Sequence, residues 1–365
     1  MQFAAALLTA GCTLASGGCQ PKPDDGPLHL VIDAGSSGTR LCLFEIQRSC
    51  DTDSQACACH APEARTAGQS TGAGTCQSIP DSPGLATLPP AGAATALARG
   101  LEQSLAPAII ERLQGAVLLG TGGFRQVPAE RRAAIVQALS SELKHNIEAS
   151  GVAVLSGSDE GRLAWLAMRE IEESSSHAIL ETGGASVQFA GGPDSQAIES
   201  ISLPIGINKA FESLQSDPQL ARCYPFGAPD GQTDFDDCRA AIRRAVFSDA
   251  AAKSLTKAAA GARDAGDDAG RLFGLGSSWR AVFAGMDQSK VSLSELLHFG
   301  RRVCAERKLT EQERTSKYLK RRCYLYAYQS VLLEETGFDR ITRGNESWPR
   351  GAAISGEFFP ACSAP

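Results

Sequence analysis

The pattern of hydrophobic and polar positions alternates between short strands and longer helices along most of the chain. A strand–turn–strand pattern occupies 28–32 and 40–46, and a second one occupies 177–181 and 187–190. The spacing elsewhere predicts short buried strands at 116–119 and 152–155. It predicts helices at 93–113, 128–149, 159–173, 249–262, 291–308 and 316–335. Alternating strands and helices favour an α/β fold, and the hairpins require mixed sheets. Since one hairpin lies in each half, we expect a duplicated architecture with a cleft between the halves.

The first nineteen residues, Met1 to Cys19, are apolar, uncharged and rich in small side chains. They resemble an export signal, although no basic segment precedes them. Cys12 and Cys19 both stand in contexts similar to bacterial lipoprotein cleavage sites, so plain cleavage and lipid attachment both stay open. We expect an exported protein that is secreted, periplasmic or at the cell surface. It would contact a membrane only through an N-terminal lipid.

Twelve Cys residues are many for a reduced cytosolic enzyme and indicate an oxidising compartment. Four of them lie close together at Cys50, Cys57, Cys59 and Cys76. Their spacing is not that of a zinc finger or ribbon, so we expect disulfides, with three possible pairings. Two further expected pairs, each closing a short loop, are Cys223 with Cys238 and Cys304 with Cys323.

The formal net charge of -6 argues against binding a nucleic acid polymer over a broad surface. A small anion held in a local pocket is still compatible with it. The sequence contains no H-E-x-x-H, no G-x-S-x-G and no G-x-x-x-x-G-K. These absences weaken zincins, nucleophile-elbow hydrolases and P-loop NTPases as explanations.

The turn of the first hairpin has the composition of a phosphate-binding loop. Glycines let backbone N–H groups approach phosphate oxygens, and hydroxyl side chains add donors. Asp33, at the strand end, can hold a hard divalent cation directly or through water. An ordinary Ser/Gly hairpin turn is the alternative. The candidate phosphate-binding residues are Gly35, Ser36, Ser37, Gly38, Thr39 and Arg40.

The second hairpin repeats this arrangement, with Glu181 at the strand end and a small-residue turn after it. Paired across a cleft, the two turns would form a two-sided phosphate clamp. Its further candidates are Gly183, Gly184, Ala185, Ser186 and Gln188.

Two more segments supply functional groups. Thr121 and Arg125 follow a buried strand, where they add a hydroxyl and a cation and are further candidates for binding phosphate. Asp159 and Glu160 open a helix, where the helix dipole already favours carboxylates. Glu160 is the better functional candidate, because Gly161 beside it leaves room for water or phosphate.

Together these four motifs resemble those of the apyrase family, the ecto-nucleoside triphosphate diphosphohydrolases. The resemblance runs from Leu28 almost to the C-terminus, and it includes the later segments 223–227 and 347–352. One departure is Glu181-Thr182, where the family has Asp-Leu. The resemblance implies an actin-like phosphotransferase fold: two ribonuclease-H-like domains with mixed sheets flanked by helices and the active site in the interdomain cleft.

The expected domain division follows from this fold. The expected parts are a leader at 1–19, a linker at 20–27, a first domain at 28–156 plus 344–365 with a Cys-rich insert at 49–92, and a second domain at 157–343.

The resemblance also implies site roles. Glu160 would be the general base for an attacking water, which Ser186 and Gln188 would hold in line. Asp33 and Glu181 would bind Ca²⁺ or Mg²⁺ through its waters. The family sandwiches the nucleobase between aromatic rings. The residues of this chain near those rings are Trp279 and Tyr328, either of which could instead belong to the core.

The expected function is therefore an exported, monomeric enzyme that hydrolyses nucleoside tri- and diphosphates to the monophosphate. An exopolyphosphatase or guanosine-pentaphosphate phosphatase is the first alternative, although Gln188 and Gly161 both favour the apyrase side. A non-catalytic nucleotide-binding surface protein is the second alternative, and the substitution at Glu181 motivates it.

Overall fold

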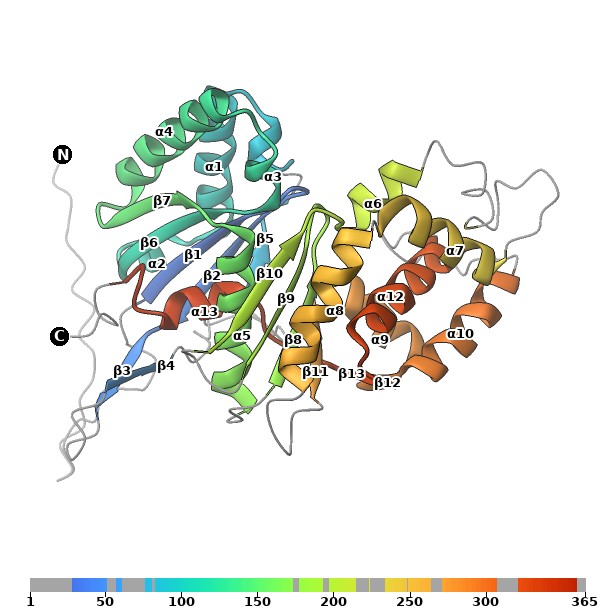
Figure 1. Cartoon of the computed structure of the whole chain (residues 1–365). Coiled ribbons are helices and arrows are strands. Elements are labelled where there is room, and N and C mark those ends of the chain that lie inside the picture. Colours follow the sequence, from blue (N-terminus) through green and yellow to red (C-terminus); the bar gives the residue numbers. More distant parts are fainter. Residues whose placement is uncertain are drawn as a thin grey trace, which may run out of the picture.

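Two mixed β-sheets flanked by helices make up the fold of the computed structural model, as the sequence pattern predicts (Figure 1). The structure describes residues 28–50, 57–60, 76–80, 83–172, 177–192, 197–214, 223, 234–247, 249–263, 271–306 and 321–359. The expected leader and linker lie outside these residues. No helix in the described part of the chain combines the length and apolarity that crossing a membrane requires.

The first sheet has the strand order β5-β2-β1-β6-β7. Its strands are β1 Leu28–Ala34, β2 Thr39–Glu45, β5 Cys76–Ser78, β6 Leu113–Gly120 and β7 Ser150–Val154. β1 is antiparallel to β2 and parallel to β6. Every residue of β1 is buried, because its alternating side chains enter cores on both faces of the sheet. One face is covered by helices α1 Pro90–Ser104 and α4 Ala129–Asn146.

The second sheet has the order β10-β9-β8-β11-β13-β12. Its strands are β8 His177–Thr182, β9 Val187–Gly192, β10 Glu199–Leu203, β11 Leu272–Leu275, β12 Lys290–Ser292 and β13 Arg340–Arg343. A large helical layer packs on one face, on the right of Figure 1. Its helices are α6 Ile207–Leu214, α7 Phe235–Val246, α8 Asp249–Arg263, α9 Ser277–Met286, α10 Leu293–Ala305 and α12 Arg322–Thr336.

Two helices join the sheets. α5 Gly157–Glu172 packs on β8, β9 and β10, and α13 Trp348–Ile354 packs on both α5 and β1. Residues of both sheets, such as Val31 and Ile179, belong to one hydrophobic core around these helices. The chain therefore returns to the first sheet near its C-terminal end, while the domain boundaries at 156/157 and 343/344 stay a prediction.

The two hairpins are built alike. Asp33 lies opposite Arg40 in the β1–β2 register, and Glu181 lies opposite Gln188 in the β8–β9 register. Each turn is closed by a backbone hydrogen bond of 3.0 Å, from Gly35 in the first hairpin and from Gly183 in the second. Equivalent positions of the two hairpins therefore hold a carboxylate at the end of the first strand.

Two expected elements have different bounds. The helix predicted over 93–113 ends at Ser104, because Pro107 begins the separate short helix α2 Pro107–Ile110, and β6 already begins at Leu113. The insert at 49–92 is more regular than its composition indicates. β5 adds to the first sheet, and a two-stranded ribbon forms from β3 Gln47–Cys50 and β4 Cys57–His60. The first part of the pattern at 316–335 lies outside the described residues.

Three disulfides are present in the described residues, and one differs from expectation. The Cys223–Cys238 and Cys304–Cys323 pairs are confirmed. Cys76, however, pairs with Cys42 rather than within the cluster of four. Cys42 occupies a buried strand position, where its sequence context is that of an ordinary core residue, and β5 places Cys76 directly opposite it. The side chains of the other three cysteines of that cluster lie outside the description.

We predict that proteolytic mapping of the purified, non-reduced protein recovers a Cys42–Cys76 linked peptide. Direct cross-strand pairing holds the two cysteines together, so this disulfide forms without any change in register. Cys304–Cys323 is the internal control for complete oxidation. A peptide linking Cys76 to any of the other cluster cysteines would contradict the predicted pairing.

Candidate active site

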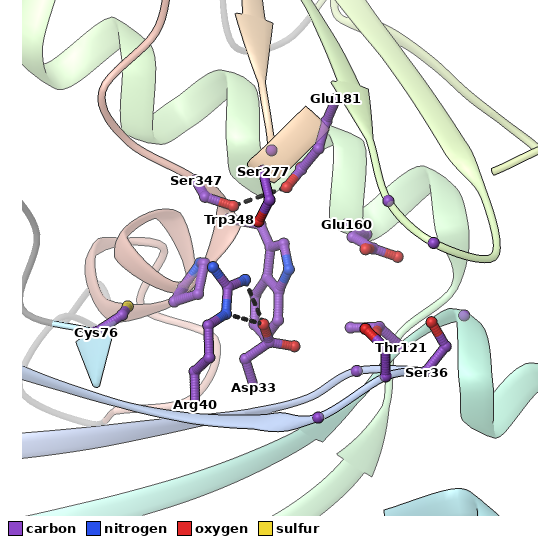
Figure 2. A pocket seen from close by; sticks show the side chains of 18 of the residues that line it. Asp33, Ser36, Arg40, Cys76, Thr121, Glu160, Glu181, Ser277, Ser347 and Trp348 are labelled. Atoms are coloured by element: carbon purple, nitrogen blue, oxygen red, sulfur yellow. Dashed lines mark hydrogen bonds and ion pairs between the residues drawn. The ribbon is translucent and has the colours of Figure 1, made fainter. Parts of the chain in front are cut away.

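A cavity of about 710 Å³ opens between the two hairpin turns (Figure 2). Both turns line it, together with the residues that begin α3 Gly122–Arg125 and α9, and the segment before α13. The predicted phosphate-binding residues that line it are Gly35, Ser36, Ser37, Gly38, Thr39, Arg40, Thr121, Gly183, Gly184 and Ala185. The predicted two-sided arrangement of small-residue turns is therefore present.

Close packing fixes the position of the first turn. A Cβ atom on Gly123 would lie 2.7 Å from the Cα of Ser36, so only glycine fits there. A Cβ atom on Gly184, in the opposite turn, would lie 3.0 Å from the Ser36 hydroxyl. The two turns thus face each other closely enough for both to contact one phosphate chain.

Asp33 and Arg40 form an ion pair at the base of the cavity. Asp33 is 5% exposed, and Arg40 donates to its Oδ2 through Nε at 2.7 Å and also through Nη2. The nearby Asp33 carboxylate is the main reason why the pKa of Arg40 is raised. The structure therefore joins a predicted metal residue to a predicted phosphate residue, and Arg40 is already largely neutralised.

Glu160 belongs to a network with the residues predicted to position water. Arg125 Nη1 donates to Glu160 Oε2 at 2.8 Å, and its Nη2 donates to Ser186 Oγ at 2.9 Å. Gln188 Nε2 donates to Ser186 Oγ at 2.6 Å and lies 3.4 Å from Glu160 Oε2. Because Ser186 accepts two hydrogen bonds, its own proton can be donated to a further acceptor, such as a water molecule.

Arg125 and Gln188 are the two members of this network that do not line the cavity. Glu160 and Ser186 line the cavity, while Gln188 is fully buried and Arg125 also contacts the Leu155 carbonyl at 3.1 Å. Arg125 therefore orients Glu160 and Ser186, and the direct phosphate contact expected of it is not supported by this geometry.

Burial raises the pKa of Glu160 to about 8. The positive charge of Arg125 opposes this shift, while the carboxylate of Glu181 adds to it. A carboxyl group with a pKa near the working pH can both accept and release a proton, as a general base must.

Gly161 has a different role from the expected one. A Cβ atom there would lie 2.6 Å from the Ser200 hydroxyl and 3.3 Å from the Cβ of Gln188. The absence of a side chain at Gly161 therefore allows α5 to pack closely on β9 and β10, and it does not leave room for water or phosphate.

Glu181 lines the same cavity as Glu160 and is 5% exposed (Figure 2). Ser347 donates a hydrogen bond of 2.7 Å to its Oε1, and Oε2 is buried without a donor among the described residues. Burial raises the pKa of Glu181 to about 7, while the Ser347 hydrogen bond and the charge of Arg40 act in the opposite direction.

The carboxylates fit a divalent cation held mainly by water and substrate. Within the described ranges, no group of three or more Asp, Glu, His or Cys side chains is arranged to bind a metal directly. Asp33 and Glu181 nevertheless both line the cavity, and Glu181 keeps one oxygen without a donor. Mg²⁺ typically keeps several waters and binds through one or two carboxylates plus substrate phosphates.

Trp279 and Tyr328 are core residues and not part of the cavity wall. Both are fully buried, and Trp279 packs against Phe283 with ring centroids 6.0 Å apart. Tyr328 donates its hydroxyl proton to the Ile205 carbonyl inside the same core. Neither ring has a face open to a nucleobase, so the stacking role expected for them is wrong in this structure.

Several polar side chains of the cavity were not predicted from the sequence. Ser277, Arg280, Arg343 and Ser347 all line the cavity. Ser277 and Arg280 follow β11, Arg343 ends β13, and Ser347 follows β13. These two parallel strands have carboxyl ends that meet at this edge of the sheet. β11 and β13 are only four residues long, too short for their pattern to predict them, and the resemblance over 347–352 gave no role to Ser347.

The fold and the facing turns define a two-domain α/β protein of the actin-like type. The GDA1/CD39 (nucleoside phosphatase) family model matches residues 21–213, more than half of the chain. The chain belongs to this family of nucleotide phosphatases. No curated protein matches it in sequence.

Solved structures of similar fold are distant in sequence. A Ppx/GppA family member from Aquifex aeolicus is 15% identical over 90% of this chain and 97% of its own, with a TM-score of 0.52. An exopolyphosphatase from Cytophaga hutchinsonii is 14% identical over 89% and 96%, with a TM-score of 0.52. A nucleoside triphosphate hydrolase from Neospora caninum is 14% identical over 92% and 93%, with a TM-score of 0.55. These similarities establish the shared fold.

We predict that Arg125→Gln moves the rising limb of the pH profile of kcat/KM by about one unit or more toward alkaline pH. Arg125 favours the ionised form of Glu160, so its removal raises the pKa of Glu160 further. Less of the base is then ionised at neutral pH. The comparison needs full profiles of the wild type and the variant.

Arg131→Gln is the matched control, because the exposed Arg131 donates to the Thr87 and Leu88 carbonyls, away from the cavity. Its profile should follow the wild type. An Arg125→Gln profile that keeps the wild-type midpoint, or that moves toward acidic pH, would contradict the proposed charge coupling.

Proposed function

We propose that the protein hydrolyses the terminal phosphoanhydride bond of nucleoside tri- and diphosphates, yielding the monophosphate and inorganic phosphate. The observation that supports this most is the Glu160–Arg125–Ser186–Gln188 network facing two small-residue turns. Phosphoryl transfer depends mainly on positioning and charge neutralisation, and these side chains supply both without a covalent nucleophile.

In this mechanism the backbone N–H groups and hydroxyls of the two turns hold the terminal phosphates. Ser186 orients a water molecule, and Glu160 accepts its proton as the oxygen attacks phosphorus. Arg125 and Gln188 keep Glu160 and Ser186 in place from behind. The P–O bond to the leaving nucleotide breaks, and its bridging oxygen leaves with the electron pair.

Asp33 and Glu181 would hold Ca²⁺ or Mg²⁺, mainly through its coordinated waters. Such a cation would neutralise charge on the phosphate oxygens. The buried Oε2 of Glu181, which has no donor among the described residues, supports this assignment.

We also propose export from the cytosol, secreted or at a cell surface with or without an N-terminal lipid, and a monomeric state. The leader-like Met1–Cys19 segment and the three disulfides of the described residues support an oxidising compartment.

A phosphatase acting on inorganic polyphosphate or guanosine pentaphosphate is the second candidate. Arg280 and Arg343 favour it, because both are exposed and line the cavity where aromatic base contacts were expected. Cationic side chains at that position suit further phosphate groups as well as a nucleotide.

A substrate panel distinguishes these functions. We expect phosphate release from ATP and ADP with Ca²⁺ or Mg²⁺, stopping at AMP, at a kcat/KM at least tenfold above that for polyphosphate. Higher efficiency on polyphosphate would favour the second candidate. The absence of phosphate release from every substrate, with nucleotide still bound, would instead identify a non-catalytic binding protein.

Glu160→Gln should lower kcat by roughly 10²–10⁴, the usual contribution of a general base. Glutamine keeps the size of the side chain but cannot accept the proton. Nucleotide affinity, measured by calorimetry, should stay close to that of the wild type. Asp159→Asn, in the same helical turn but half-exposed and outside the cavity lining, is the control. Wild-type turnover in Glu160→Gln would remove Glu160 from the mechanism.

A further inference from the structure

Ser347 lies between β13 and α13, and its hydroxyl contacts the cavity instead of its own helix. A serine directly before a helix commonly accepts a hydrogen bond from the backbone of the first turn. Ser347 makes no such bond. It donates its proton at 2.7 Å to Oε1 of Glu181, which lies 166 positions away in the chain (Figure 2). Ser347 thus stands at a helix-capping position, but its hydroxyl bonds a residue of the candidate active site instead of capping the helix.

The duplicated hairpins show why Glu181 needs this partner. In the first hairpin, the residue opposite Asp33 is Arg40, which neutralises that carboxylate. In the second, the residue opposite Glu181 is Gln188, whose Nε2 lies within hydrogen-bond distance of Ser186, Ser202 and Glu160 instead. The equivalent carboxylate therefore receives no donor from the neighbouring strand.

The Ser347 hydrogen bond leaves the two oxygens of Glu181 in different states. Oε1 has a donor, while Oε2 is buried and has none among the described residues. Buried acceptors nearly always have a partner in folded proteins, so an acceptor without one in a cavity points to a ligand. A cation or a water bound to it suits a carboxylate oxygen.

The segment around Ser347 is firmly held. Trp348 is buried, and Arg350 Nε donates to Glu170 Oε2 on α5 at 2.6 Å. A Cβ atom on Gly351 would lie 1.8 Å from the Leu163 carbonyl oxygen, so α13 packs tightly on α5. The same helix α5 holds Glu160 in its first turn. The Ser347 hydroxyl is thus presented from a rigid element.

We propose that Ser347 is a positioning residue for Glu181. Its hydrogen bond fixes Oε1, so that the rotatable side chain of Glu181 presents Oε2 to the divalent cation or to a water on that cation. This role rests on the proposed function, because it assigns the cation to Glu181.

A double-mutant cycle tests the proposal through metal binding. Calcium would be titrated calorimetrically into protein saturated with a non-hydrolysable β,γ-imido analogue of ATP. We expect Ser347→Ala to weaken calcium binding about tenfold, the lower end of the effect of removing a group that orients a metal-binding side chain. Ser347→Thr, which keeps the hydroxyl, should retain most of the affinity.

The second arm of the cycle uses Glu181→Asp. Aspartate is one methylene shorter and does not reach Ser347 from the same backbone position, so Ser347→Ala should change calcium affinity less than twofold in that background. Ser355→Ala, at the other end of α13, removes a hydroxyl that donates locally to the Ala352 carbonyl and should have no effect. Thermal unfolding of each variant checks that the fold is kept.

Calcium affinity of Ser347→Ala within twofold of the wild type would overturn the proposal. An equal loss in the wild-type and Glu181→Asp backgrounds would overturn it as well. A failure of the proposed function is distinguishable from these results. It would appear as a wild-type protein that binds calcium without hydrolysing ATP or ADP, and the calcium affinity of Ser347→Ala would still decide the role of Ser347 in such a protein.

Discussion

Three buried carboxylates share one cavity between the two sheets, and the arrangement of the site follows from the need to stabilise them. Asp33, Glu160 and Glu181 are each at most 7% exposed. Burial without a partner strongly disfavours an ionised carboxylate. The chain provides an arginine for two of them and only a hydroxyl for the third. A divalent cation would offset the negative charge that remains, which supports the proposed metal–nucleotide substrate.

The two hairpins have equivalent carboxylates but different residues opposite them, so the two sides of the cavity differ in charge. Arg40 neutralises Asp33 within the same hairpin, so the carboxylate charge on this side of the cavity is already balanced. Gln188, at the position equivalent to Arg40, leaves Glu181 without a cation across the strand and contributes instead to the network around Glu160. The proposed base Glu160 and the candidate metal carboxylate Glu181 therefore depend on groups from outside their own elements, namely Arg125 and Ser347.

Local sequence signals were sufficient for the hairpins and their turns, because acidic residues followed by glycines and hydroxyls have few structural alternatives. They also identified Glu160, Ser186 and Gln188, which the fold brings together. Contacts that depend on packing between distant segments were not predictable. Trp279 was assigned to a base site through the family resemblance, and a large aromatic ring has the same sequence signature in a core as in a binding pocket. Ser347 and the Cys42–Cys76 pair depend on which segments the sheets and α13 bring together, and no local pattern encodes this.

Oxygen-18 transfer from water to product follows the reaction at the phosphorus atom itself. ATP hydrolysed by the wild type in ¹⁸O-labelled water, with magnesium present, should give inorganic phosphate with one ¹⁸O atom per phosphate released and unlabelled ADP and AMP, because in the proposed mechanism Glu160 directs water to the terminal phosphorus of each nucleotide. Mass spectrometry of both products reads this directly. Label in the nucleotide would mean that water attacks an inner phosphorus, and it would contradict the placement of the terminal phosphate between the two turns beside Glu160.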